Sequence, residues 1–285
     1  MNSKLKLKIA SVQKLITYIL GVYLNGINLI SKKIGGKHAF LLFCYPFPVK
    51  LKPVQAKFLE TSKQSFFDFD GKKLATYQWG SGPQTILCLH GWQSQSFRWK
   101  KYIEELDKEK YTIISIDAPA HGNSEGKIFN VPMYAKVIER LLADYQVDYI
   151  LAHSLGSFAA MCLFYEKPAL AVTKVALLGT PGEASDFVDE YARVLKTHPR
   201  VKENLRSYFL EYAGLTPEYY STARFAPVQT SKALLIHDKQ DKEAPYHYAK
   251  KVAELWPNAK LITTDGFGHK LRDLSVVKAV KDFFG

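Results

Sequence analysis

The sequence is poor in the residues that cross-link a chain or ligate metals. Its 285 residues include three cysteines, Cys44, Cys88 and Cys162, which lie far apart and form no CxxC pair. This spacing does not suggest a disulfide framework and does not supply a zinc cage, and no histidines have the HExxH spacing of a zinc protease. We therefore expect buried, unpaired thiols in a reducing compartment, hence a cytoplasmic protein, with no metal and no cofactor.

Acidic side chains are missing from the first 57 residues. This segment holds ten lysines, which leaves 29 basic residues against 27 acidic ones in the rest of the chain. The net charge of +12 is thus concentrated at the N-terminus, and such an asymmetry indicates an anionic surface as partner. Because no nucleic-acid-binding motif accompanies the lysines, we expect peripheral contact with an anionic membrane and no contact with nucleic acid.

A long apolar run is missing as well. The uncharged stretch 15–31 has only 17 residues, among them Asn25 and Asn28, whereas a membrane span takes about 20 predominantly apolar residues. A helix over 4–31 is still predicted, because its polar residues recur every three or four positions in one narrow stripe. This helix has three possible interpretations: an amphipathic helix against the body or a membrane surface, a membrane anchor, or a signal sequence. The first is favoured, since no small-x-small cleavage site follows Leu24.

From residue 66 onward, strands alternate with helices. Residues 66–80 predict a hairpin that turns at Asp70-Gly71, and six short apolar runs follow, at 85–89, 111–116, 149–152, 174–178, 233–237 and 260–263. This alternation is typical of an α/β fold, a mostly parallel central sheet with helices on both faces.

Two domain boundaries follow from this pattern. We predict a basic helical N-terminal extension over 1–57 and an α/β domain over 58–285. The connection 183–231 is too long for a simple crossover and reads as two helices, at 185–197 and 201–213. We expect it to form a small helical cap over the carboxyl edge of the sheet.

The most informative position is Ser154. A predicted strand runs directly into this serine and a predicted helix starts directly after it, as in a nucleophile elbow. The turn needs small residues on both sides, and Ala152 and Gly156 supply them. A serine that merely caps a helix is the alternative, but it would not require the neighbouring motifs described next.

These motifs resemble those of the α/β-hydrolase superfamily over roughly residues 66–285. Ala152-His-Ser-Leu-Gly156 is similar to the family's G-x-S-x-G elbow, with Ala at the first Gly. His90-Gly91-Trp92 resembles the HG motif, and 117–124 resembles the D-x-P-x-H-G-x-S loop that shapes the floor of the site. The resemblance implies an oxyanion hole made by the backbone N–H groups of Trp92 and Leu155, and a structural role for His90.

The same resemblance implies the acid and the base. His269 lies in a glycine-containing loop after the last strand, where the family places its base. Asp241 follows a strand end in a stretch similar to G-x-x-D-x-x-V-P, with His237 at the first Gly. Asp238, nearer the strand, and Glu183, after the preceding strand, are alternative acids. Ser154, Asp241 and His269 are therefore the predicted catalytic triad.

A serine at this position argues for acyl transfer to water, with a small acyl compound as substrate. We expect hydrolysis of a carboxylic ester, while an acyltransferase, a C–C bond hydrolase and an amidase or peptidase stay open on the same triad. A non-catalytic binding protein and a membrane-recruitment module are alternatives from other classes. Candidate residues for the substrate pocket are Phe97, Trp99 and Phe267.

Overall fold

A computed structural model describes residues 3–285, with side chains from Val12 onward. The chain divides into two compact units, each built from two stretches of sequence. The sheet unit consists of Pro46–Gly182 and Ser221–Gly285, and the helical unit consists of Met1–Tyr45 and Glu183–Tyr220. The helical unit thus takes in residues 183–220 of the predicted insertion, whereas 221–231 belong to the sheet unit. The predicted position of the insertion over the sheet stays a prediction.

An eight-stranded sheet forms the centre of the sheet unit, in the order β1-β2-β4-β3-β5-β6-β7-β8. β1 and β2 form the predicted antiparallel hairpin and β2 is antiparallel to β4, while all other neighbours are parallel. The predicted mostly parallel sheet is therefore confirmed. Its strands are Lys63–Phe69 (β1), Lys72–Trp79 (β2), Gln84–Leu89 (β3), Tyr111–Ile116 (β4), Tyr149–His153 (β5), Lys174–Leu178 (β6), Lys232–Asp238 (β7) and Ala259–Thr264 (β8).

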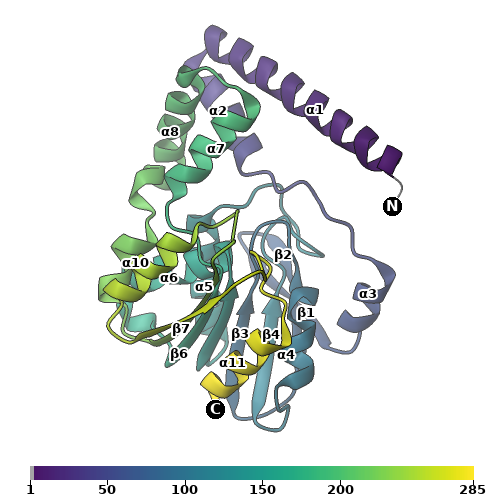
Figure 1. Cartoon of the computed structure of the whole chain (residues 1–285), viewed down its shortest axis with the longest axis vertical. Helices are drawn as coiled ribbons and strands as arrows, with labels where there is room; N and C mark the ends of the chain where they lie inside the picture. The colour runs from purple at the N-terminus through teal and green to yellow at the C-terminus, as the bar shows by residue number, and fades with distance from the viewer. Residues whose placement is uncertain (1–2) are drawn as a thin grey trace. The chain divides into compact units, whose positions relative to one another are not determined.

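Helices cover both faces of this sheet. α5, α6 and α10 lie on one side and α4 and α11 on the other (Figure 1). Helix α6 is apolar all round and buried from Gly156 to Phe164, as expected for a helix enclosed by other elements. The helices of this unit are Pro53–Leu59 (α3), Lys100–Glu105 (α4), Val131–Asp144 (α5), Leu155–Glu166 (α6), Thr222–Phe225 (α9), Tyr246–Leu255 (α10) and Leu274–Phe284 (α11), with 3-10 turns at Ser96–Trp99 (η1), Pro168–Leu170 (η2) and Ala226–Val228 (η4).

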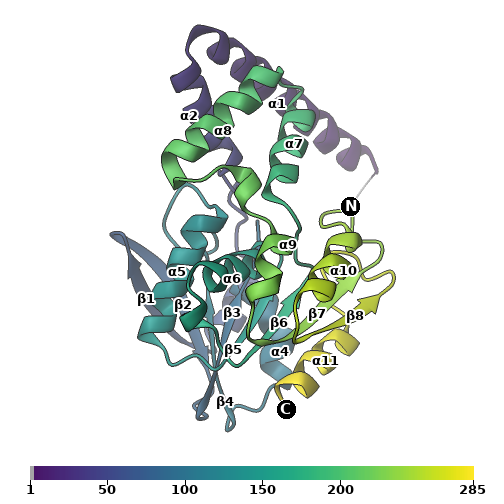
Figure 2. The same ribbon diagram turned by 90° about the vertical axis from the view of Figure 1, so that its left-hand side faces the viewer.

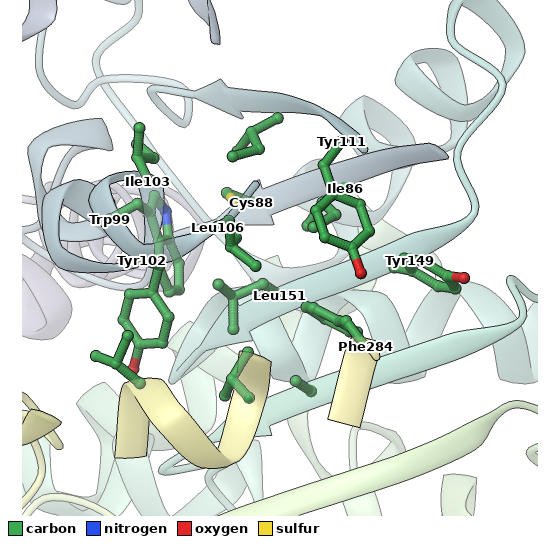
Figure 3. Close-up of a cluster of buried hydrophobic side chains, with 14 of the residues drawn as sticks. Ile86, Cys88, Trp99, Tyr102, Ile103, Leu106, Tyr111, Tyr149, Leu151 and Phe284 are labelled. Carbon is green, nitrogen blue, oxygen red and sulfur yellow. The ribbon is translucent and has the colours of Figure 1, made fainter. Parts of the chain in front are cut away.

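The core between the sheet and the α4–α11 side is rich in aromatic rings (Figure 3). Phe284 of α11 stacks on Tyr149 of β5 with ring centroids 5.2 Å apart, and Trp99 packs edge-on against Tyr102 at 5.6 Å. Cys88 is buried in the same cluster. All three cysteines are buried, as predicted.

The described part of the helical unit contains four helices, Ser3–Ile30 (α1), Lys32–Phe43 (α2), Ala184–Leu195 (α7) and Pro199–Ala213 (α8), with a 3-10 turn at Pro217–Tyr219 (η3). They form one group of helices in Figure 2. Its small core combines residues of both sequence stretches, among them Leu24 and Ala39 from the first and Val188 and Leu205 from the second. The helices predicted at 4–31, 185–197 and 201–213 are confirmed. None of the helices in the described part of the chain combines the length and the apolar character that a membrane span requires.

Candidate active site

The predicted direct passage from strand to helix at Ser154 is present at the carboxyl end of β5. Ser154 connects β5 to α6 with φ 53° and ψ −125°, a conformation that costs a non-glycine residue free energy and is common at functional sites. Its N–H donates to Leu178 O at 2.9 Å, and its carbonyl accepts from Phe158 N at 3.1 Å. The backbone thus fixes the serine in a strained turn at the edge of the sheet.

Small residues let neighbouring backbone approach this turn. A Cβ on Gly156 would lie 2.4 Å from Leu89 O, and a Cβ on Gly91 would lie 2.6 Å from Ser154 Cβ. Both distances are too short for an alanine without movement of the neighbouring chain. The loop after β3, which holds Trp92, is therefore packed directly against the elbow.

His269 lies between the serine and a carboxylate. Its Nε2 atom is 3.0 Å from Ser154 Oγ, and its Nδ1 atom is 2.8 Å from Asp241 Oδ2. With Nδ1 protonated, the ring donates to Asp241 and accepts the Ser154 hydroxyl proton. The three predicted residues, which come from three separate loops, are thus joined in one hydrogen-bonded chain.

Asp241 is held as an anion by several donors. Burial alone would raise the pKa of this carboxyl, but hydrogen bonds from His237, His269 and Ala244 N outweigh it and hold the pKa well below its usual range. The Oδ1 atom accepts from Glu243 N and Ala244 N, both at 2.9 Å. The carboxylate is therefore fixed in orientation and charge.

The two alternative acids, Asp238 and Glu183, lie elsewhere in the structure. Asp238 Oδ2 accepts from Thr264 Oγ1 at 2.7 Å and from Phe267 N at 2.8 Å, so its carboxylate ties the end of β7 to the loop that carries His269. Glu183 belongs to the helical unit, directly before α7. Of the two aspartates, Asp241 is the one that bonds the His269 ring.

His153 supports His269 in a way that the sequence did not reveal. Its Nε2 atom donates to the His269 carbonyl at 2.8 Å, and the two rings lie 4.7 Å apart. Burial lowers the pKa of His153 well below its usual value, so the ring is neutral. The sequence places His153 next to Ser154 but does not indicate that His153 contacts His269.

His90 has the structural role that the resemblance implied. Its Nδ1 donates to Gly91 O at 2.7 Å, and its Nε2 accepts from Ala118 N at 2.9 Å. Burial lowers its pKa to about 4. This neutral ring bridges the loops after β3 and β4.

Asp117 organises the loop after β4. It accepts from Ser96 N at 2.7 Å and from Asn123 N at 2.9 Å, which links this loop to η1. Ser124 Oγ accepts from Ala75 N at 2.8 Å and donates to Asp117 O. The hydroxyl of Ser124 is therefore engaged in loop structure.

The three predicted pocket residues differ in placement. Phe97 packs edge-on against Phe58 with centroids 5.7 Å apart, and Phe267 is 37% exposed in the loop that carries His269. Trp99 is fully buried in the core cluster beside Tyr102 (Figure 3). This burial corrects the prediction for Trp99, because a ring enclosed by the core has no face for a substrate.

In the described part of the chain, no group of three or more His, Cys, Asp or Glu residues is placed to hold a metal ion. The chain's own polar atoms around Ser154 are a hydroxyl, an imidazole, a carboxylate and backbone N–H groups. This set is suited to nucleophilic acyl chemistry.

Comparison with known proteins identifies the family of the chain. A model of the α/β-hydrolase fold matches residues 84–217, and a model of TAP-like proteins matches 216–285. The chain belongs to the α/β-hydrolase superfamily. The uncharacterized hydrolase YugF of Bacillus subtilis is 35% identical over 106 residues, and the human serine hydrolase-like protein is 33% identical over 116 residues.

Both matches are partial. They cover 35% and 38% of this chain, and 38% and 56% of the two relatives' own lengths. Among solved structures, a membrane phospholipase A is similar in fold, with a TM-score of 0.62 at 13% identity, over 99% of this chain and 96% of that chain. This α/β-hydrolase therefore shares its fold with enzymes whose sequences differ widely from its own.

Proposed function

We propose that this α/β-hydrolase cleaves a carboxylic ester with Ser154 as nucleophile, His269 as general base and Asp241 as the acid that orients the base. The observation that carries the proposal is the hydrogen-bonded chain from Ser154 Oγ through His269 to Asp241 Oδ2, with links of 3.0 and 2.8 Å. An unassisted hydroxyl is a weak nucleophile at neutral pH, so a serine needs such a base.

In the first half of the reaction, Ser154 Oγ attacks the ester carbonyl carbon while His269 Nε2 takes the hydroxyl proton. The negative charge that develops on the carbonyl oxygen is stabilised by the backbone N–H groups of Trp92 and Leu155, and one such donor contributes about 10²–10³ in rate. When the C–O bond to the leaving group breaks, His269 returns the proton to the departing alcohol. An acyl group then remains on Ser154.

Water completes the cycle. His269 Nε2 takes a proton from the water as its oxygen attacks the acyl carbon, and the proton returns to Ser154 Oγ as the acid product leaves. Asp241 stabilises the imidazolium each time it forms. The serine, instead of a carboxylate, favours acyl transfer to water. The similarity in fold to a membrane phospholipase A supports an ester as the bond cleaved.

Labelling with a fluorophosphonate tests the nucleophile, because this reagent reacts covalently with an activated serine. We expect the full chain to label and Ser154→Ala to lose both labelling and hydrolysis of aryl esters. The matched control is Ser157→Ala, which removes a buried hydroxyl one turn further along α6 that has no hydrogen-bond partner. A folded wild-type protein that does not label, or a Ser154→Ala variant that labels equally, would contradict the assignment.

A further inference from the structure

The polar stripe of helix α1 faces the other helices of its own unit. Asn25 Oδ1 accepts from His198 N at 2.7 Å, and Asn28 Oδ1 accepts from Asn204 Nδ2 at 2.8 Å. Gly21 is buried in the same stripe, where a Cβ would lie 2.0 Å from Leu195 O. The polar and small residues of α1 are thus used for close contact with α7 and α8.

The opposite side of α1 is apolar and open to solvent. On a helical projection of 100° per residue, its exposed apolar residues span an arc of about 160°. We call these residues the outer face of α1. They range from 47% exposed at Tyr23 to 86% at Ile30: Val12, Leu15, Ile16, Tyr18, Ile19, Val22, Tyr23, Leu29 and Ile30.

An ordinary surface helix turns its polar side to water. Helix α1 instead turns an apolar side to water, and it packs polar residues together with Leu24 against its own unit. A contiguous exposed apolar surface of this kind marks an interaction site. Since the polar side of α1 is already bonded to α7 and α8, the outer face is left to contact the partner. The helix can therefore lie along an apolar boundary while its polar side remains attached to the unit.

The positive charge of the N-terminal segment favours an anionic lipid surface over a second copy of the chain as the partner. The first 57 residues carry ten lysines and no acidic residue, and Lys14, Lys32, Lys33 and Lys37 are exposed in the helical unit. Apolar side chains beside lysines fit an anionic lipid surface. The apolar side chains enter the boundary of the acyl chains, and the lysines contact the anionic headgroups. Two copies of the chain would instead bring like charges together.

We propose that the outer face of α1 docks in the plane of an anionic phospholipid membrane. Apolar burial supplies part of the binding and the lysines supply the rest, so association weakens as salt rises. The proposal does not depend on the reaction at Ser154.

The test is flotation of the full chain with vesicles of phosphatidylcholine, with and without phosphatidylglycerol. We expect binding to the mixed vesicles and at least about a tenfold loss when the anionic lipid is omitted. The triple variant Leu15→Gln/Ile19→Gln/Val22→Gln should reduce binding by about tenfold or more, because each of these side chains would otherwise leave water.

The matched control is Val54→Gln/Phe66→Gln/Leu274→Gln, which changes three equally exposed apolar residues of the sheet unit, at 66%, 64% and 61% exposure. It should bind as wild type does. Circular dichroism and fluorophosphonate labelling check that each variant is folded, independently of lipid binding. The proposal fails if wild type does not float, or if both triple variants bind equally. The proposal also fails if light scattering shows that wild type is a dimer and that the α1 triple variant, but not the control variant, is a monomer. That result would mean that the outer face joins two copies of the chain.

Discussion

The Nε2 atom of His237 lies 3.3 Å from the Oδ2 atom of Asp241, the same carboxylate oxygen that receives the His269 ring. His237 Nε2 also donates to Ala244 O at 2.7 Å. Its N–H is therefore directed toward both a carbonyl and the carboxylate of the proposed triad. The position is one where the pattern of the superfamily has glycine, so this chain provides Asp241 with a donor that a glycine could not supply.

We expect His237→Ala to lower kcat for ester hydrolysis by about 10–100-fold with little change in KM, because Asp241 loses one of its donors and holds His269 less firmly. His237→Gln keeps an N–H at a similar reach and should recover part of the rate. Steady-state kinetics on an aryl ester measure both. Equal loss in the two variants would assign His237 to packing alone.

The acid is identified by comparing two neighbouring aspartates. Asp241→Asn should lower kcat by about 10³–10⁴-fold, because an amide cannot stabilise the imidazolium of His269. Asp238→Asn should chiefly lower stability, by about 1–3 kcal/mol, since it weakens the bonds to Thr264 and to the Phe267 N–H. Kinetics together with urea unfolding separate the two effects, and the reverse ranking in kcat would give the acid role to Asp238.

Stability should depend on pH through Asp241. Its folded-state pKa lies below the usual range, so the ionised carboxyl stabilises the native state above its unfolded pKa of about 3.9. That contribution is lost as the pH falls from there toward the folded-state pKa. The difference in unfolding free energy between wild type and Asp241→Asn should thus be larger at pH 7 than at pH 3. A difference independent of pH would mean that the charge of Asp241 does not stabilise the fold.

We expect substitutions at the two small residues of the elbow, Gly156 and Ala152, to differ in their effects on stability and labelling. Gly156→Ala places a methyl group 2.4 Å from Leu89 O, and we expect about 1–3 kcal/mol of destabilisation with loss of fluorophosphonate labelling. Ala152→Gly restores the glycine of the superfamily pattern and should cost only about 0.5–1 kcal/mol while labelling persists. Thermal unfolding and labelling of both variants check this, and full labelling of Gly156→Ala would show that the turn can relax.

Much of the sheet unit could be predicted because its signals are local. Alternating apolar runs define the strands, and a serine between a strand and a helix defines the elbow. The resemblance of short loop motifs to those of the superfamily implies the positions of Asp241 and His269. Each of these features depends on a few consecutive residues.

Features that depend on contacts across the chain could not be predicted in the same way. The spacing of Asn25 and Asn28 indicates a polar stripe but not which surface the stripe contacts. In the structure these two residues bond His198 and Asn204, which are 173 and 176 positions further along the chain. The same is true of Trp99. Its position shortly after the HG motif does not indicate whether its ring lies in the core or lines a substrate pocket. His153 and His237 act through loops that fold back onto them, which no local pattern encodes.

The mixed origin of the helical unit also bears on how the protein can be shortened. Leu24 and Ala39 pack with Val188, Leu195, Val201 and Leu205 in one small core, so α1 and α2 are not an independent appendage. Deleting the first 45 residues would uncover that core on α7 and α8. An N-terminally trimmed protein that loses activity or aggregates would therefore report damage to the 183–220 insertion as well as the loss of α1.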